Sequence, residues 1–192
     1  GGTTVVLTGT NLGGLNRSHC VFAMWANSPK SPSDLVCNGE ADFPGEGEVP
    51  FENIVSASHT HIEFKMPAGM GSRVIYLVIR GVVSPSGAPY RYDAPELVAM
   101  TPGNGTTDGG TKVTLTGKSL GAPEFSGVSV MEVQFHKYLC SYAQDANCKI
   151  VSHDHNEVVF PMPEGMGTDI TVHMVVGGRT SIESPRLEVS YS

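Results

Sequence analysis

Hydrophobic and polar residues alternate over short runs throughout the chain, and this pattern predicts β-strands rather than helices. Between Thr111 and Thr116, Val113 and Leu115 fall on one face while Lys112, Thr114 and Thr116 fall on the other. Further alternating runs follow at Met131–Phe135, Val158–Met162 and Ile170–Val176. Gly and Pro separate these runs at short intervals, and no segment keeps the period of about 3.6 residues that marks an amphipathic helix. The predicted fold class is therefore all-β.

The alternating pattern occurs twice. GGTTVVLTGTNLG at residues 1–13 returns as GGTKVTLTGKSLG at 109–121, and MPAGMG at 66–71 returns as MPEGMG at 162–167. The first pair is displaced by 108 residues and the second by 96, so the first repeat has the longer middle. The excess matches an acidic insertion, DLVCNGEADFPGEGEVPFEN, that the second half lacks. We predict an internal duplication with repeats at residues 1–93 and 94–192, each a small antiparallel sandwich.

One strand differs between the repeats in the polarity of its outer face. A displacement of 96 assigns the inward positions of this strand to Val74, Tyr76 and Val78, and the outward positions to Ile75, Leu77 and Ile79. The outward residues of the second repeat are the more polar Thr171, His173 and Val175. An exposed apolar stripe is typical of a contact surface, although the neighbouring repeat or residues outside this segment could also cover it. Trp25 is a second candidate contact residue, with a core position as its alternative.

Composition and charge narrow the class of partner. The formal net charge is −7 and no cluster of Lys or Arg occurs, which disfavours nucleic acid. No apolar run approaches the roughly 20 residues that span a bilayer. The chain begins without Met and without a signal peptide. We interpret it as a piece of a larger polypeptide, so that any membrane attachment would lie in other parts of that polypeptide.

The cysteines indicate the compartment. Of the four, two lie in each half, and we favour the pairs Cys20–Cys37 and Cys140–Cys148 because each pair stays within its own repeat. Paired cysteines suit an extracellular or cell-surface location, whereas the alternative is four free thiols in a cytosolic protein. The sequons at Asn16 and Asn104 are compatible with glycosylation of a secreted chain.

Candidate chemistry is sparse. The sequence lacks the nucleophile-elbow, zinc-protease, P-loop and dinucleotide-binding motifs. Two histidine pairs could begin a metal site, and the carboxylates between Ser31 and Phe64 could hold calcium, but neither set has the spacing of a known metal motif. These histidines are His59, His61, His153 and His155. We therefore expect no catalytic residues, no metal and no cofactor.

The stretch Tyr92–Gly121, YDAPELVAMTPGNGTTDGGTKVTLTGKSLG, resembles the start of an IPT/TIG domain. Pro102, Gly-Gly-Thr at 109–111 and the Thr-Gly-x-x-Leu-Gly turn at 116–121 carry the resemblance. It implies two tandem immunoglobulin-like sandwiches. The first lacks its leading strand, because residue 1 already belongs to the Gly-Gly motif. Such domains occur in plexin-type and Met-type receptor ectodomains, in large surface proteins, in Rel-type transcription factors and beside carbohydrate-active enzymes.

Three functions are compatible with this resemblance. The leading one is a non-catalytic extracellular segment of a cell-surface protein that serves adhesion, ligand recognition or spacing, with another protein or neighbouring domains as partner. A carbohydrate-binding or spacer module of a secreted enzyme ranks second, because Trp25, Tyr90 and Tyr92 form no evident row for stacking on sugars. A Rel-type DNA-binding or dimerisation module ranks third, because the basic surface it needs is missing.

Overall fold

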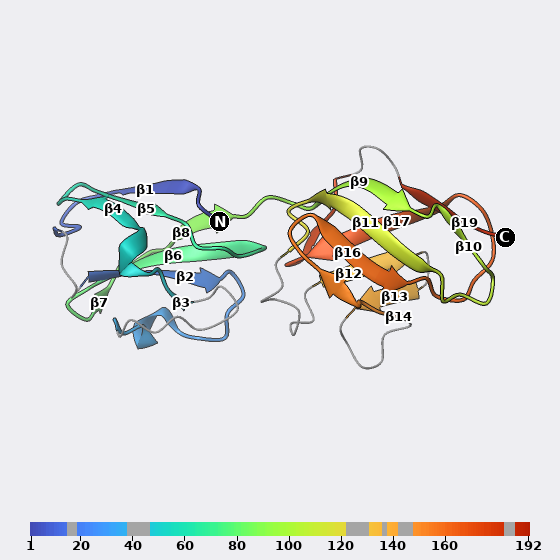
Figure 1. The fold of residues 1–192 in the computed structure, drawn as a ribbon. Coiled ribbons are helices and arrows are strands. Elements are labelled where there is room, and N and C mark those ends of the chain that lie inside the picture. Colours follow the sequence, from blue (N-terminus) through green and yellow to red (C-terminus); the bar gives the residue numbers. More distant parts are fainter. Residues whose placement is uncertain (15–18, 38–46, 122–130, 136–137, 142–147, 183–186) are drawn as a thin grey trace. The chain divides into compact units, whose positions relative to one another are not determined.

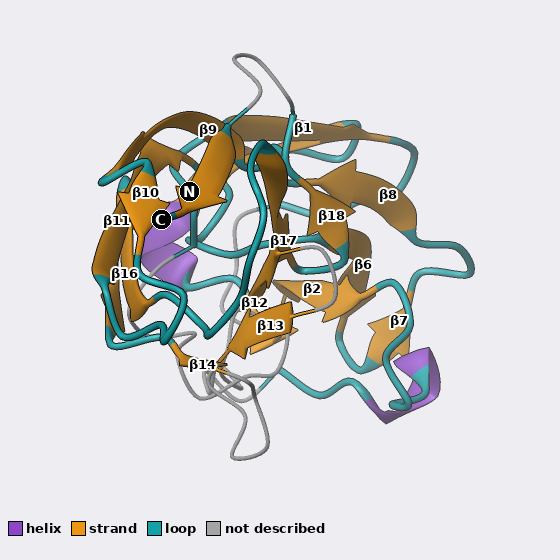
Figure 2. Cartoon of the chain, turned by 90° about the vertical axis from the view of Figure 1, so that its right-hand side faces the viewer, coloured by secondary structure: helices purple, strands orange, loops and turns teal. Residues whose placement is uncertain are grey.

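The computed structural model describes residues 1–14, 19–37, 47–121, 131–135, 138–141, 148–182 and 187–192. These residues form strands and loops, with single-turn 3-10 helices at Pro32–Asp34 (η1) and Phe51–Asn53 (η2) (Figures 1 and 2). Neither of the helices in this part of the chain has the length of a membrane-spanning segment. The chain forms two compact units, Gly1–Tyr92 and Asp93–Ser192, divided next to the predicted boundary. The all-β fold class is confirmed.

Unit 1 contains two antiparallel sheets. The smaller sheet has the order β1-β5-β4, formed by Thr4–Thr8 (β1), His61–Lys65 (β5) and Ile54–Ala57 (β4). The larger sheet has the order β3-β2-β6-β7, and β8 also pairs with β6. Its strands are Gly47–Glu48 (β3), His19–Trp25 (β2), Ser72–Ile79 (β6), Val82–Val83 (β7) and Ala88–Arg91 (β8).

Unit 2 repeats this plan with additional strands. One sheet has the order β15-β16-β11-β9, formed by Ser152–His153 (β15), Glu157–Pro161 (β16), Lys112–Lys118 (β11) and Glu96–Thr101 (β9). The other has the order β10-β19-β17-β12-β13-β14, with β18 on β17. Its strands are Asn104–Gly105 (β10), Glu188–Tyr191 (β19), Ile170–Val176 (β17), Met131–Phe135 (β12), Tyr138–Ser141 (β13), Cys148–Lys149 (β14) and Arg179–Thr180 (β18). The expected pair of immunoglobulin-like sandwiches is thus present.

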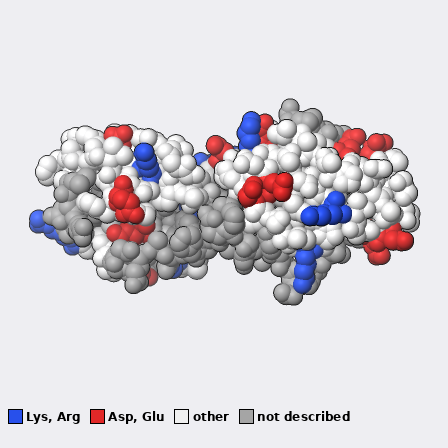
Figure 3. Space-filling view, viewed as in Figure 1, with Lys and Arg blue, Asp and Glu red and all other residues white. Residues whose placement is uncertain are grey.

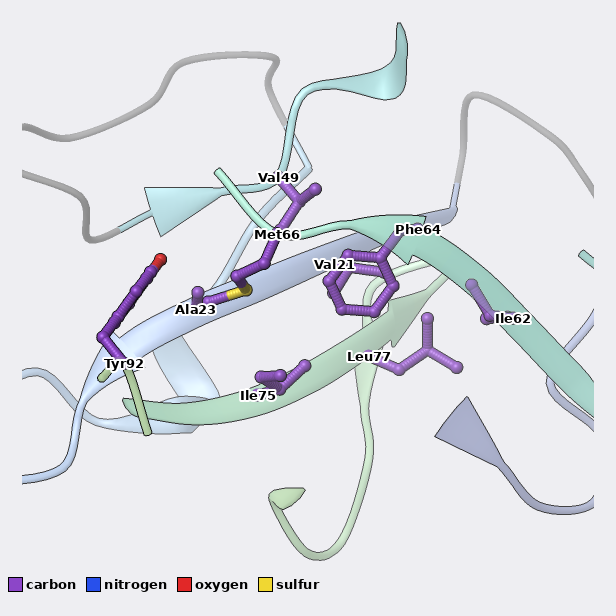
Figure 4. Packing of buried hydrophobic residues seen from close by; sticks show 9 residues of the cluster. All are labelled: Val21, Ala23, Val49, Ile62, Phe64, Met66, Ile75, Leu77 and Tyr92. Atoms are coloured by element: carbon purple, nitrogen blue, oxygen red, sulfur yellow. The ribbon is translucent and has the colours of Figure 1, made fainter. Parts of the chain in front are cut away.

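The inward side chains of both sheets form the core of unit 1. Ile62 and Phe64 on β5 face the core, while the residues between them face outward, as the two-residue period of a strand requires. Residues of β2 and β6 approach them from the other sheet, and Phe64 is completely buried (Figure 4). This burial of aliphatic and aromatic surface is the main favourable contribution to folding.

The two repeated sequence motifs lie side by side in each unit, and this contact accounts for their recurrence. In unit 1 the amide of Gly2 donates to the carbonyl of Met66 at 2.7 Å, and in unit 2 the amide of Gly110 donates to that of Met162 at 2.8 Å. Gly2 and Gly110 have φ of 88° and 81°, a conformation that favours glycine. The Gly-Gly-Thr motif therefore serves the join between two strands.

A tyrosine near the end of each unit closes the Met-Pro-x-Gly turn. The hydroxyl of Tyr92 donates to the carbonyl of Pro67 at 2.8 Å, and the hydroxyl of Tyr191 donates to that of Pro163 at 3.0 Å. A Cβ added at Gly69 would lie 2.5 Å from the hydroxyl oxygen of Tyr92. The glycine of this turn is therefore present because the tyrosine ring occupies the space beside it.

Candidate contact surface

Strand β6 buries both of its faces, which corrects the predicted contact surface. Ile75 and Leu77 are only 3% and 6% exposed, and they pack in the core between the sheets with Ile79 half-buried against them. On the other face, Val78 is fully buried beside Leu35. The interpretation of Ile75, Leu77 and Ile79 as an exposed apolar stripe is wrong.

The error comes from one residue of register. The amide of Ser84 donates to the carbonyl of Leu77 at 2.8 Å, and the amide of Ser181 donates to that of Met174 at 2.7 Å. These equivalent pairs are displaced by 97 residues, whereas the preceding Met-Pro motifs are displaced by 96. Because side chains alternate with a period of two, a shift of one residue exchanges the two faces of the strand.

A disulfide-linked segment covers the outer face of β6. Cys20 on β2 is bonded to Cys37, with their Cα atoms 5.7 Å apart. The segment that leads to Cys37 brings Leu35 onto a cluster that includes Phe22, Met24 and Val78. The face that the sequence analysis assigned to the core is therefore covered by this segment of the same unit.

Unit 2 has its own disulfide, between Cys140 and Cys148, which lie on the paired strands β13 and β14. Both bonds follow the pairing that the sequence analysis favours. Of the two sequons, Asn104 lies exposed on β10, whereas Asn16 is outside the described residues.

A buried arginine and two tyrosines form a cluster in unit 1 that the sequence analysis missed. Arg73 on β6 is 1% exposed, and its Cζ lies 5.8 Å from the centroid of the Tyr92 ring, within the range of a cation–π contact. Tyr90 meets Tyr92 edge to face with ring centroids 5.1 Å apart. Burial raises the pKa of Tyr92 to about 12, and the positive charge of Arg73 partly opposes this shift.

Trp25 lies opposite Arg73 in the β2–β6 pairing, but its side chain is outside the described part of the chain. Its candidacy as a contact anchor therefore remains a prediction. The sequence signal for the cluster is an arginine at the start of the apolar strand β6. The corresponding residue of unit 2, in the register of the hairpins, is Ile170.

One group of polar side chains resembles part of a catalytic arrangement. On the outer face of the small sheet of unit 1, the Oγ of Ser56 lies 3.4 Å from Nε2 of His61, whose Nδ1 lies 2.8 Å from the Oγ of Ser58. The hydroxyl of Ser56 also donates to Oε2 of Glu63 at 3.3 Å. An activated nucleophile needs a base that is itself held by an orienting group. Here the atom next to Nδ1 of His61 is the Oγ of Ser58, which already accepts hydrogen bonds from the amides of Thr60 and His61. These side chains therefore have the properties of a surface hydrogen-bond network.

The histidine pairs do not form a metal site in the described residues. His59 and His155 occupy equivalent places, where their carbonyls accept from the amides of Leu12 and Leu120 at 3.0 and 3.1 Å. The Nδ1 of His155 also bonds to the carbonyl of Gly121 at 2.9 Å. No three His, Cys, Asp or Glu side chains within the described ranges come together as a potential metal site. Residues 38–46 of the acidic insertion lie outside these ranges.

The surface charge is dispersed. Figure 3 shows Lys and Arg as isolated side chains on the face in view, interspersed with small acidic groups. The ion pair between Lys118 and Glu96, at 3.5 Å, joins two exposed side chains and adds little stability. This distribution differs from the continuous basic face that binds phosphates.

Comparisons with known proteins support the fold. The family model described as IPT/TIG domain matches residues 95–191, just over half of the chain. No curated protein sequence matches. Similar solved structures include the extracellular region of plexin A4 (19% identity, TM-score 0.44, 100% of this chain and 14% of that one). A second is the surface glycan-binding protein PbSGBP-B from Prevotella bryantii, with 15% identity and a TM-score of 0.44 over 96% of this chain and 36% of that one. A third is SGBP-B from a xyloglucan utilization locus in Bacteroides uniformis, with 16% identity and a TM-score of 0.36 over 98% of this chain and 44% of that one.

The chain spans less than half of the length of each of these structures. At such identities and TM-scores the likeness carries no conclusion about what the chain does.

Proposed function

Because the chain belongs to the IPT/TIG domain family, we propose that it is a non-catalytic extracellular segment of a larger cell-surface protein. In this proposal its two immunoglobulin-like units space and present surfaces for protein recognition. The observation that carries the proposal is that each unit contains one disulfide, Cys20–Cys37 in unit 1 and Cys140–Cys148 in unit 2. Such bonds persist in oxidising compartments and are rare in the cytosol.

The charge of the chain supports a protein partner over nucleic acid. The formal net charge is −7, and the Lys and Arg side chains on the face that Figure 3 shows are dispersed. A transcription-factor module would need a basic face to neutralise phosphates, because that electrostatic term supplies most non-specific affinity for DNA. The resemblance to Rel-type modules is therefore limited to the fold.

The polar groups of unit 1 support a non-catalytic role. The network of Ser56, His61 and Glu63 lies on the outer face of a three-stranded sheet, and each of its members is partly exposed to solvent. Catalytic groups normally act in a concave site that excludes water and holds the substrate. We therefore assign no reaction to this network.

Secretory expression tests the proposal. The full chain is produced with a secretion signal, and its intact mass is compared before and after reduction and alkylation. Peptide mapping then identifies linked cysteines and any glycan on Asn104, with Asn104→Gln as the matched control. Secreted, monodisperse protein with both native disulfides supports the proposal. A chain that is retained in the cell, or that folds equally well with four free thiols, contradicts it.

The carbohydrate-binding alternative is tested on the same secreted preparation. A glycan array exposes the folded chain to many oligosaccharides at once, and reduced, unfolded protein serves as the control for non-specific adsorption. Saturable binding that depends on the fold would replace protein recognition by sugar recognition as the proposed function.

A further inference from the structure

The side-chain amide of Asn104 lies exposed at the edge of a sheet. Its strand, β10, is the outermost strand of the large sheet of unit 2 and pairs with β19 on one side (Figure 1). Among the described residues no group forms a hydrogen bond with this amide, whereas the side-chain amide of Asn53 donates to the carbonyl of Lys65 at 2.9 Å. The nitrogen Nδ2 of Asn104 is therefore accessible from solvent.

Gly105 explains why Asn104 faces outward. A Cβ added at Gly105 would lie 2.5 Å from Sδ of Met162 and 3.0 Å from Oγ1 of Thr111, so this residue packs against the core. Because successive residues of a strand face opposite sides, the side chain of Asn104 points away from the core. Its partner on β19 is the small residue Ser190, which leaves room for a large group on the outer face.

The stretch Asn104–Thr106 is an acceptor sequence for N-linked glycosylation, Asn-x-Thr with a residue other than Pro in the middle. In this reaction an oligosaccharide passes from a lipid-linked diphosphate donor to the asparagine. A bond forms between Nδ2 and the first sugar, and the bond from that sugar to the diphosphate breaks. Nδ2 loses a proton and the lipid diphosphate leaves. An exposed amide without a hydrogen-bond partner can carry this bulky group without any loss of packing.

The hydroxyl of the acceptor sequence is engaged once unit 2 has folded. Oγ1 of Thr106 donates to the carbonyl of Gly109 at 3.1 Å, and the amide of Thr106 donates to Oγ1 of Thr111 at 3.4 Å. The transferring enzyme recognises this hydroxyl together with the asparagine, so the folded turn withholds one part of the acceptor. Transfer therefore has to precede the closure of the turn.

We propose that Asn104 carries an N-linked oligosaccharide, which is attached before unit 2 folds and projects from the outer face of β10. This inference rests on the extracellular location proposed above, because the donor and the enzyme act in the secretory pathway. It also refines that proposal. The sugar occupies the outer face of the large sheet beside β19, so that other faces of unit 2 remain for a protein partner.

Peptide mapping of the secreted chain tests the site. A glycosidase that converts glycosylated asparagine to aspartate, used in heavy-oxygen water, marks each occupied position by its mass. A digest without the glycosidase corrects for spontaneous deamidation of the Asn-Gly pair. We expect the mark at Asn104 in most molecules. Thr106→Ser should keep it, whereas Thr106→Ala and Asn104→Gln should abolish it.

The outcomes separate this inference from the proposed function. A secreted chain that has both disulfides and an unmodified Asn104 overturns the inference and leaves the proposed function standing. A chain that folds equally well with four free thiols contradicts the proposed function and the inference with it.

Transfer to purified protein tests the timing. The chain made in the periplasm of a bacterium without the transferring enzyme is folded, oxidised and unglycosylated. It is offered to the enzyme and a lipid-linked donor beside the same chain after reduction, alkylation and unfolding. We expect the unfolded chain to be modified at least about tenfold faster, because its Thr106 hydroxyl is free of the turn. Equal rates, or faster modification of the folded chain, overturn attachment before folding.

The variant Asn104→Gln in the same unglycosylated protein tests the outward placement. By scanning calorimetry the unfolding midpoint of unit 2 should change by less than about 3 °C, as expected for an exposed side chain without a structural partner. A larger decrease shows that the amide supports the fold, and it overturns the assignment of Asn104 as an outward-facing acceptor.

Discussion

Replacing Gly69 with alanine should destabilise unit 1 through a single neighbour, Tyr92. An alanine Cβ at this position would lie 2.5 Å from the hydroxyl oxygen and 2.6 Å from Cζ of that tyrosine. The ring cannot stay in place, and its movement breaks the 2.8 Å hydrogen bond to the carbonyl of Pro67. Gly14 has no atom within 4 Å of its added Cβ and no positive φ, so Gly14→Ala is a matched control.

The expected cost follows from three contributions. Overpacking a well-packed site costs about 1–3 kcal/mol. Loss of the tyrosine hydrogen bond costs about 1 kcal/mol more. Alanine also makes the unfolded chain less flexible than glycine does, which offsets roughly 0.4–1 kcal/mol of this cost. We therefore expect the free energy of unfolding to fall by about 2 kcal/mol, which corresponds to a decrease of roughly 8–16 °C in the unfolding midpoint of a unit of this size.

Urea denaturation followed by tryptophan fluorescence measures this effect, because the only tryptophan of the chain, Trp25, belongs to unit 1. The decisive background is Tyr92→Leu, which removes the distal ring atoms that the alanine would meet. In that background Gly69→Ala should cost less than about 0.5 kcal/mol, so that the two changes are strongly coupled. Equal costs of Gly69→Ala in both backgrounds, or a cost no larger than that of Gly14→Ala, would refute the reasoning.

Three further predictions concern burial, the disulfide and ionisation in unit 1. Leu77→Ala should cost about 2–4 kcal/mol in urea denaturation because the side chain is 6% exposed in the core, whereas Val82→Ala, at a 71% exposed position, should stay within about 0.5 kcal/mol. The double variant Cys20→Ser/Cys37→Ser should lose about 3 kcal/mol in the same assay, as expected for a sequence separation of 17. Ultraviolet absorbance should show a tyrosine with a pKa of about 12 that Tyr92→Phe removes. Because folding raises the pKa of Tyr92 from 10.0, the protonated hydroxyl makes its full contribution to the free energy of unfolding below pH 10. Roughly 2–3 kcal/mol of that contribution is lost as the pH rises to 12.

The fold could be predicted from the sequence because its strongest signals are local. Alternation along β11, β16 and β17 places inward residues such as Val113, Phe160 and Met174 correctly, and all three are fully buried. The repeated glycine motifs then identify the number of sandwiches, since each motif requires the same backbone conformation and the same neighbour. Such requirements are visible in a single sequence.

The faces of β6 could not be predicted from the Met-Pro motif, because a loop between the motif and the strand differs by one residue. The hairpin after the strand carries the better signal. Arg80 and Gly81 have φ of 50° and 79°, and Gly177 and Gly178 have 57° and 76°, as two-residue turns of type I′ require. Aligning the strands on these turns gives the displacement of 97 that the structure shows. The turn is the better reference because it fixes the register of the strands on either side of it.

The distinction between shared and unshared residues also separates folding from function. The residues that recur in both units contact one another within each unit. Gly69 lies against Tyr92 in unit 1, and Gly165 lies against Tyr191 in unit 2. Their recurrence therefore reports the closure of a sandwich and carries no information about a ligand. Arg73 has no charged counterpart in unit 2, since the equivalent strand position is Ile170. Arg73 is buried, so a partner that distinguishes the two units must recognise exposed residues that differ between them. Substitutions at such exposed positions should change binding without the large losses of stability expected at the repeated positions.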